Sequence, residues 1–426
     1  MKTFRSQRHG RTFVIGGVSA VVALSLTTSI AQAAPVAPKP SASKVVSCTP
    51  ETGVDSTTVK IGVVTPKTGA AAPTFDGFWQ AAQVRFDQEN AKGGVNGRKV
   101  KAIVYDDQAN PSVQTSVASK ALDQDGVFGI VVGSSTDSME TMLKDRNVPV
   151  TGYNQLAMGT NRNAFSATGV STPLAQSTAI IERLKQDGAT RIANINHATA
   201  GATNSGNTYS KMIPLVAGVT ESLRIADEPQ GAHDATSTAL RIKNTNSDAW
   251  IGTMFVDGGV SIGQALNAQG VKMKTGTIAG LTDPAVISKG GPALEGIIGS
   301  TSGPVPVQAD VRGAKTVLSS LKAAGVNPYN ASSAVGYVAA DLMIAGLKKA
   351  GKCPTREGFI SALRATKGYT ANGFLPGPID FTPGITPNGN PAKCSWYVKV
   401  INGAPVADKK ATCGSIIELA TGKVIG

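Results

Sequence analysis

The stretch from Val59 to Pro111 constrains the fold more than any other part of the chain. A short apolar run, Val59 to Val64, ends in a loop that contains Pro66, as a buried parallel strand does. An amphipathic stretch follows at about 77–90. A second apolar run, Lys99 to Tyr105, then closes on two aspartates. Strand, helix and strand in this order predict a right-handed βαβ unit at the edge of a parallel sheet.

Polar side chains follow the strands that continue this sheet. The apolar runs Gly126 to Gly133 and Val148 to Gly152 extend the alternation of strand and helix. In open parallel sheets, ligands bind outside the carboxyl ends of the strands. The loop from Thr65 to Phe75 and the residues after the two later strands are therefore candidates for a binding site. Those residues are Ser134, Ser135 and Thr136, and then Tyr153, Asn154 and Gln155.

Four motifs in the opening stretch carry a family resemblance. They are the strand IGVV, a Thr-Gly loop, a helix that ends in NAKGGVNGR, and a strand that closes on DDQANP. This order resembles the opening of type I periplasmic binding proteins, in the branch that includes the leucine/isoleucine/valine-binding proteins. The resemblance runs through nearly the whole chain after about Asp55. It implies a protein without catalytic activity that captures a small solute between two lobes and delivers it to an ABC importer.

The predicted fold is α/β, with two Rossmann-like lobes of parallel sheets flanked by helices. A chain of 426 residues can bury two full cores. Together with the resemblance, the repeated strand–helix order gives two segments to each lobe. Lobe 1 is expected to hold residues 55–167 and 301–375, and lobe 2 residues 168–300 and 376–426. Three crossings, at Phe165–Thr168, Gly296–Ser300 and Phe374–Phe381, would form a hinge that closes over the solute.

The hydrophobic pattern also predicts helices after the first lobe segment. They are expected at Ala175 to Gln186, Thr208 to Leu215, Thr236 to Lys243, Val260 to Gln269, Ala309 to Ala324 and Ser333 to Ala350.

The amino terminus has the features of an export signal. A basic region precedes the apolar run Phe13 to Ile30, and an Ala-Gln-Ala cleavage site ends at Ala33. Residues 1–33 are therefore expected to be a cleaved signal peptide, and residues 34–54 a flexible leader. An uncleaved membrane anchor is the competing interpretation, but Gly, Ser and Thr dilute the run. Because the first cysteine is Cys48, well past the run, we expect no lipid anchor. The expected location is extracytoplasmic.

Composition bears on the partners and on catalysis. Aromatic residues make up 5% of the chain, and no basic run is dense, so we expect no nucleic-acid partner despite the formal charge of +13. Nucleophile-elbow, zinc-protease, phosphate-loop and dinucleotide motifs are absent, and we expect no metal or cofactor. After the signal region the histidines are His197 and His233. A Ser-His-Asp relay through His197 stays open, because triads assemble from distant segments.

Four cysteines in an exported chain indicate two disulfides, and four cysteines allow three pairings. Cys48 precedes the first strand, and Cys353 follows a helix that returns to the same end of lobe 1. Cys394 and Cys413 flank a hairpin that turns at Asn402-Gly403. We therefore expect Cys48–Cys353 and Cys394–Cys413. Metal-binding thiols are the alternative, but no Cys-x-x-Cys pair is present.

The resemblance assigns roles to the candidate ligand residues. It implies that Ser134, Ser135 and Thr136 hold the carboxylate of an amino acid, and that Tyr153, Asn154 and Gln155 help to hold its ammonium group. Hydroxyls and backbone N–H groups at a helix start favour an anion. The alternative is that the first group only caps the next helix.

Three further candidates complete the predicted site. Phe75 lies where the relatives offer an aromatic ring to the solute, or else it only packs against the following helix. Met254 could line an apolar pocket, although a buried Met is often core filler. Asp283 is the nearest candidate for a carboxylate partner of the ammonium, which a buried charge needs. Asp before Pro is also a common turn residue. If Asp283 faces solvent, the solute is not expected to be an α-amino acid.

Overall fold

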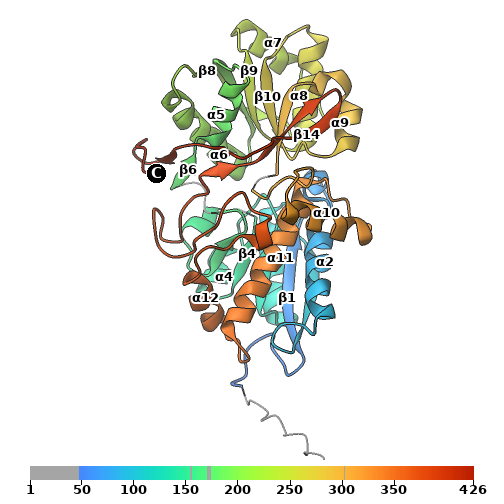
Figure 1. Ribbon diagram of the computed structural model, residues 1–426, viewed down its shortest axis with the longest axis vertical. Helices are drawn as coiled ribbons and strands as arrows, with labels where there is room; N and C mark the ends of the chain where they lie inside the picture. The colour runs from blue at the N-terminus through green and yellow to red at the C-terminus, as the bar shows by residue number, and fades with distance from the viewer. Residues whose placement is uncertain (1–47, 154–155, 170–173, 302) are drawn as a thin grey trace, which may run out of the picture. The chain divides into compact units, whose positions relative to one another are not determined.

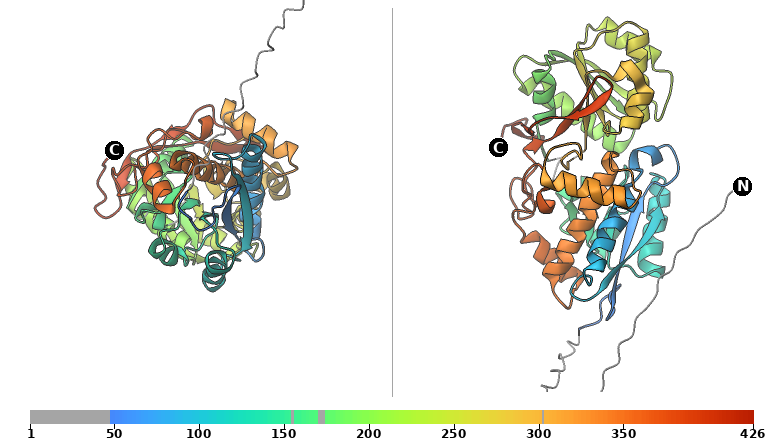
Figure 2. Two further views of the ribbon diagram at one scale, coloured as in Figure 1. Left: turned by 90° about the horizontal axis from the view of Figure 1, so that it is seen from below. Right: turned by 45° about the vertical axis from the view of Figure 1, so that its right-hand side comes forward.

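The computed structural model describes residues 48–153, 156–169, 174–301 and 303–426 (Figures 1 and 2). The predicted signal peptide and leader up to residue 47, together with Asn154 and Gln155, lie outside the described residues. Within the described ranges, no helix is both long enough and apolar enough to cross a membrane.

The first sheet has five strands, and all of its pairings are parallel. Its order is β2-β1-β3-β4-β5. The strands are β1 (Thr58–Thr65), β2 (Lys99–Asp106), β3 (Gly129–Val132), β4 (Val150–Gly152) and β5 (Ala164–Ser166). Because β1 and β2 pair at the edge and α2 (Phe78–Ala91) connects them, the predicted βαβ unit is confirmed.

The second sheet has seven strands in the order β14-β13-β11-β10-β9-β7-β8. Its parallel strands are β7 (Arg191–His197), β8 (Thr220–Glu228), β9 (Ala249–Thr253), β10 (Thr275–Ala279) and β11 (Ile297–Ser300). The predicted hairpin at Asn402-Gly403 is confirmed as β13 (Tyr397–Ile401) and β14 (Ala404–Ala407), which add an antiparallel edge.

Helices and two small sheets complete the structure (Figure 1). The remaining α-helices are α1 (Ala72–Phe75), α3 (Pro111–Ser119), α4 (Glu140–Asp145), α5 (Ala179–Gln186), α6 (Ala200–Met212), α7 (Thr236–Asn244), α8 (Val256–Ala268), α9 (Pro284–Gly290), α10 (Arg312–Ala323), α11 (Ala331–Ala350) and α12 (Arg356–Arg364). The small sheets pair β6 (Ala175–Ser177) with β16 (Ile416–Glu418), and β12 (Cys394–Ser395) with β15 (Thr412–Cys413).

Three predicted elements were wrong. The expected helix at 175–186 begins as β6, because the distant C-terminal β16 supplies a strand partner there. The expected helix at 208–215 begins eight residues earlier as α6, because the Thr199 hydroxyl accepts the Ala202 N–H and caps it. The expected crossing at 296–300 is largely β11, an apolar strand between β10 and β13.

Both expected disulfides are confirmed, as Cys48–Cys353 and Cys394–Cys413. The first joins the start of the described chain to the segment after α11, 305 residues away. The second links β12 to β15, on either side of the hairpin.

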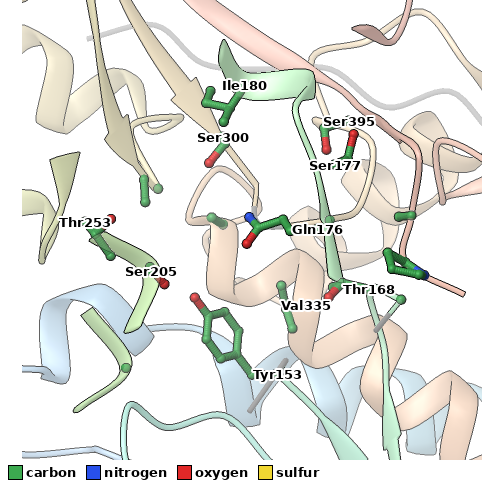
Figure 3. Close-up of a pocket in the computed structure, with 18 of the residues that line it drawn as sticks. Tyr153, Thr168, Gln176, Ser177, Ile180, Ser205, Thr253, Ser300, Val335 and Ser395 are labelled. Atoms are coloured by element: carbon green, nitrogen blue, oxygen red, sulfur yellow. The ribbon is translucent and has the colours of Figure 1, made fainter. Parts of the chain in front are cut away.

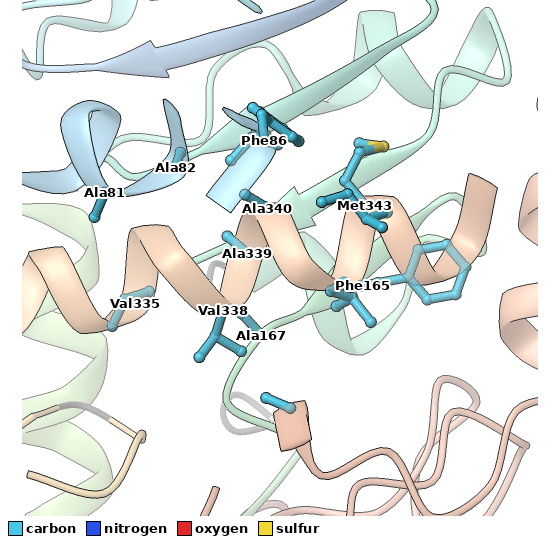
Figure 4. Packing of buried hydrophobic residues seen from close by; sticks show 14 of the residues in the cluster. Ala81, Ala82, Phe86, Phe165, Ala167, Val335, Val338, Ala339, Ala340 and Met343 are labelled. Atoms are coloured by element: carbon cyan, nitrogen blue, oxygen red, sulfur yellow. The ribbon is translucent and has the colours of Figure 1, made fainter. Parts of the chain in front are cut away.

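Close packing between α2 and α11 forms the centre of the first core (Figure 4). Small residues of α11, including Ala339 and Ala340, are fully buried against this core. A methyl group added to Gly336 would lie 2.1 Å from the carbonyl oxygen of Phe78, so the two backbones nearly touch. Phe78, Ala82 and Phe86 form a fully buried stripe on α2, as expected for the amphipathic stretch predicted at about 77–90.

This contact predicts a specific sensitivity. Gly336→Ala should lower the free energy of unfolding by about 1–3 kcal/mol, because neither backbone can yield without opening the core. Gly201→Ala in α6 is the matched control, since its added methyl would meet only an ordinary contact at 3.7 Å and alanine favours helix. Urea unfolding measures both. Equal effects of the two substitutions would contradict the proposed packing.

Candidate solute-binding site

A cavity of about 600 Å³ lies at the carboxyl ends of strands from both large sheets. The first sheet contributes the loops after β1, β3 and β4. The second contributes the ends of β7, β9, β10 and β11. The cavity is also lined by β6, by the first turns of α6 and α11, and by residues 375–380 and 390–397. This is the position that the rule for parallel sheets predicts.

Most of the predicted site residues lie in the lining of this cavity. They are Phe75, Ser134, Ser135, Thr136, Tyr153 and Met254. Asn154 and Gln155 lie outside the described residues.

Asp283 does not belong to the lining, which corrects the expectation that its carboxylate would meet a solute. It is the N-cap of α9, where Oδ1 accepts the Ala285 N–H at 2.8 Å. Its Oδ2 accepts from the side-chain amide of Asn327 at 2.5 Å. Asp before Pro at a helix start is a capping pattern, and that alternative interpretation describes this residue.

Asp106, the last residue of β2, holds the first candidate loop in place. Its Oδ1 accepts the backbone N–H of Lys67 at 2.8 Å, and its Oδ2 accepts the Thr68 hydroxyl at 2.7 Å. These hydrogen bonds fix the loop that leads to Phe75. Despite partial burial, they lower the pKa of Asp106, so the carboxylate stays charged at neutral pH.

Gln114, which is fully buried on α3, holds the second candidate loop. Its Nε2 donates to Asp107 Oδ2 and to the carbonyl oxygen of Thr136, both at 2.8 Å. Its Oε1 accepts from the Ser138 hydroxyl at 3.1 Å and from the Met139 N–H at 3.3 Å. The loop that carries Ser134 to Thr136 is therefore attached to α3 and to the end of β2.

Aromatic side chains form one face of the cavity. Phe75 is 4% exposed and meets Tyr153 edge to face, with ring centroids 5.8 Å apart and an interplanar angle of 80°. Phe75 also clusters with Phe255, which precedes α8. Phe75 thus contacts residues from both sheets, and its edge-to-face arrangement with Tyr153 is a favourable aromatic geometry.

The geometry of His197 argues against a catalytic relay. Its Nε2 accepts the backbone N–H of Phe255 at 2.9 Å, so Nδ1 carries the proton and donates to the carbonyl oxygen of Glu228 at 2.9 Å. Burial lowers the pKa of His197 and keeps the ring neutral. Both nitrogens are committed to backbone groups, so this ring has no free position for a nucleophile's proton.

Several lining residues were not predicted from the sequence. They are Gln176 and Ser177 on β6, Asn204 and Ser205 on α6, Thr253 and Ser300 at strand ends, and Ser395 to Tyr397. Figure 3 labels six of these residues, namely Gln176, Ser177, Ser205, Thr253, Ser300 and Ser395. Thr253 and Ser300 follow the same strand-end rule that identified Ser134, so that rule could have found them. Gln176 and Asn204 were hidden because the local pattern misplaced β6 and the start of α6.

The network around Gln114 can be tested by a charge change. Gln114→Glu should lower the free energy of unfolding by about 2–3 kcal/mol at pH 7. The glutamate carboxylate could not donate hydrogen bonds to Asp107 and to the carbonyl oxygen of Thr136, and it would be repelled by the Asp107 carboxylate. The loss should shrink as the pH falls, since protonation of either carboxyl restores a donor. The exposed Gln186→Glu is the control and should change little. A pH-independent loss at Gln114 would contradict this role.

The state of His197 predicts a pH dependence of stability. Its folded pKa lies below the ordinary value of 6.5, so the unfolded chain takes up the proton more readily. The stability contributed by neutral His197 is complete above about pH 6.5 and is lost as the pH falls through the folded pKa. In the His197→Gln variant, the side chain at this position has no titratable group. The difference in unfolding free energy between wild type and this variant should therefore narrow from pH 7 to pH 5, and a constant difference would contradict the assignment.

Comparisons with known proteins agree with this architecture. The family model described as "Periplasmic binding protein" matches residues 58–405. The chain is 25% identical over 319 residues to the Leu/Ile/Val-binding protein BraC3 of Rhizobium johnstonii, covering 72% of this chain and 84% of that protein. It is 24% identical over 329 residues to the leucine-, isoleucine-, valine-, threonine- and alanine-binding protein of Pseudomonas aeruginosa, covering 75% and 85%.

Solved structures show the same fold with different solutes in their names. A fatty acid ABC transporter substrate-binding protein from Thermomonospora curvata superposes with a TM-score of 0.72 at 20% identity, covering 89% of this chain and 97% of that one. A leucine-binding protein from Thermotoga maritima gives 0.69 at 19% identity, with 83% and 98% covered. A solute-binding protein from R. palustris in complex with 4-hydroxybenzoate gives 0.68 at 19% identity, with 84% and 97% covered. The chain therefore belongs to the type I periplasmic binding proteins of the leucine/isoleucine/valine-binding-like family, whose members bind solutes and are not enzymes.

Proposed function

We propose that this protein is an extracytoplasmic solute-binding protein that takes one small molecule into the cavity and delivers it to an ABC importer. The observation that carries the proposal is the cavity itself, of about 600 Å³, lined by hydroxyl, amide and aromatic side chains from the ends of both sheets. A pocket of this size, with few charged groups, suits reversible capture of a small molecule. Relatives whose names refer to ABC transporters support the importer as partner.

The lobes are proposed as the moving parts. Strands β1 to β5 fall within residues 55–167, and β7 to β11 fall within residues 168–300. α10 and α11 lie in residues 301–375, and β13 and β14 lie in residues 376–426. This distribution supports two lobes with three connections, which would close over a solute as a hinge does.

The proposed solute is a small carboxylate or amide in place of the default branched-chain or other amino acid. Names of the curated relatives favour an amino acid. The position of Asp283 at a helix cap argues against it, because a buried ammonium needs a carboxylate. The names of two solved relatives refer to a fatty acid and to 4-hydroxybenzoate. The proposed contacts are Phe75, Ser134, Ser135, Thr136, Tyr153 and Met254.

Export is proposed to depend on the N-terminal 33 residues as a cleaved signal peptide, followed by a leader to residue 54. A sensor that presents its liganded form to a membrane receptor is the alternative to import. Uptake of the bound solute by cells that lack this chain separates the two roles. Lost uptake supports import, and retained uptake with a lost response to the solute supports sensing.

Binding itself is tested by thermal unfolding of the purified protein against amino acids, amides, and aliphatic and aromatic acids. A solute at a hundred times its dissociation constant should stabilise the fold by about 2.7 kcal/mol. Tyr153→Phe should weaken binding about three- to tenfold, because its hydroxyl points into the cavity (Figure 3). Tyr337→Phe is the control, since that hydroxyl donates to Gln88 outside the lining. A shift with leucine, isoleucine or valine alone would restore the amino-acid assignment, and no shift with any solute would oppose the proposal.

A further inference from the structure

Among the described residues, three polar atoms of the lining are buried without a hydrogen-bond partner. They are Oε1 of Gln176, Nδ2 of Asn204 and Oγ1 of Thr253. Each has lost water without gaining a protein partner, which costs about 1–3 kcal/mol per group. Native structures rarely keep such groups without a reason. Other described residues also have buried atoms without a partner, but these three border the same cavity, where a bound molecule would supply their hydrogen bonds.

These groups come from three separate elements that meet at the cavity. Gln176 lies on β6, Asn204 on α6, and Thr253 at the end of β9. In Figure 3 the amide of Gln176 reaches into the middle of the cavity, and the hydroxyl of Tyr153 points to the same space from below. Ser205 and Thr253 lie on the opposite side from Thr168.

Gln176 is firmly placed by its surroundings. β6 pairs with β16, where Gln176 lies opposite Ile417. The neighbouring Ser177 hydroxyl donates to the carbonyl oxygen of Lys393 at 2.7 Å, next to the disulfide Cys394–Cys413. The C-terminal segment therefore fixes the strand that presents this amide to the cavity.

The hydrogen-bonding sense of the three groups limits what can satisfy them. The oxygen of Gln176 only accepts, the nitrogen of Asn204 only donates, and the hydroxyl of Thr253 does either. An ammonium offers donors alone, and a carboxylate offers acceptors alone. A neutral group with a donor beside an acceptor can meet all three.

The charges of the lining favour the same conclusion. Among the described residues, the part of the lining that comes from β6 through β11 and from residues 390–397 contains no carboxylate. His197 is neutral, and Lys393 is exposed. On the other side, Asp137 and Asp380 are partly exposed, and Oδ1 of Asp380 accepts the Gly368 N–H at 2.6 Å. A fully buried ion would therefore be poorly compensated.

We infer that the solute is electrically neutral, with a donor and an acceptor side by side as in a carboxamide, and that Gln176, Asn204 and Thr253 select it. This inference rests on the proposed function of the same cavity and narrows it from carboxylates and amides to neutral solutes.

The test uses matched probes that differ only in charge. Isothermal titration of the purified protein compares 4-hydroxybenzamide with 4-hydroxybenzoate and 4-hydroxybenzylamine, and hexanamide with hexanoate and hexylamine. In at least one series the amide should bind at least about tenfold more tightly than both ions, because each ion leaves one lining group unmatched. Tighter binding of an acid or an amine in either series would overturn the inference and leave the proposed function intact.

Variants assign the selectivity to named residues. Gln176→Ala and Thr253→Val should each weaken binding of the amide about tenfold and reduce its advantage over the acid. Gln186→Ala, at an exposed glutamine, is the matched control and should leave both affinities unchanged. Unchanged selectivity in both cavity variants would overturn the inference. If no probe binds and no small molecule co-purifies with the protein, the proposed function fails as well.

Discussion

The close contact of α2 with α11 is the constraint on which the rest of this structure depends. α11 belongs to a segment that begins after the chain has completed β11 of the second sheet, and it returns to pack against α2 and β4. Only small side chains allow this approach, because a Cβ added to Gly336 would lie 2.1 Å from the carbonyl oxygen of Phe78. The N-terminal residues Ser332 and Val335 of the same helix then line the cavity. Core packing and the binding site thus share one helix.

The cavity is positioned by buried polar groups as much as by apolar packing. Asp106 and Gln114 attach two loops of the first sheet to β2 and α3 through hydrogen bonds of 2.7 to 3.3 Å. Neither residue belongs to the lining of the cavity. The lining, by contrast, includes Oε1 of Gln176, Nδ2 of Asn204 and Oγ1 of Thr253, which have no partner within the described protein. The residues that hold the loops are thus hydrogen-bonded within the protein, whereas some polar atoms of the lining are left for a ligand. This arrangement is typical of a preformed binding site.

The sequence predicted the fold well because its strongest signals are local. The apolar runs of β1 and β3, the stripe of α2 and the Asn-Gly turn depend only on neighbouring residues, and each was confirmed. The errors at β6 and β11 have a different cause, since each depends on pairing with the C-terminal segment, more than 90 residues away. The same pairing brings Gln176 to the cavity. The misplaced Asp283 shows the limit of analogy, because a capping residue and a ligand residue share one sequence pattern.

The central claim is that one small molecule occupies this cavity. Native mass spectrometry of the purified protein with a solute that stabilises it tests the claim most directly. We predict one solute per chain for the wild type and markedly lower occupancy for Ser205→Trp, in which the indole projects into the cavity. Urea unfolding verifies the fold of the variant. Equal loading of the wild type and the tryptophan variant would place the solute elsewhere and contradict the account.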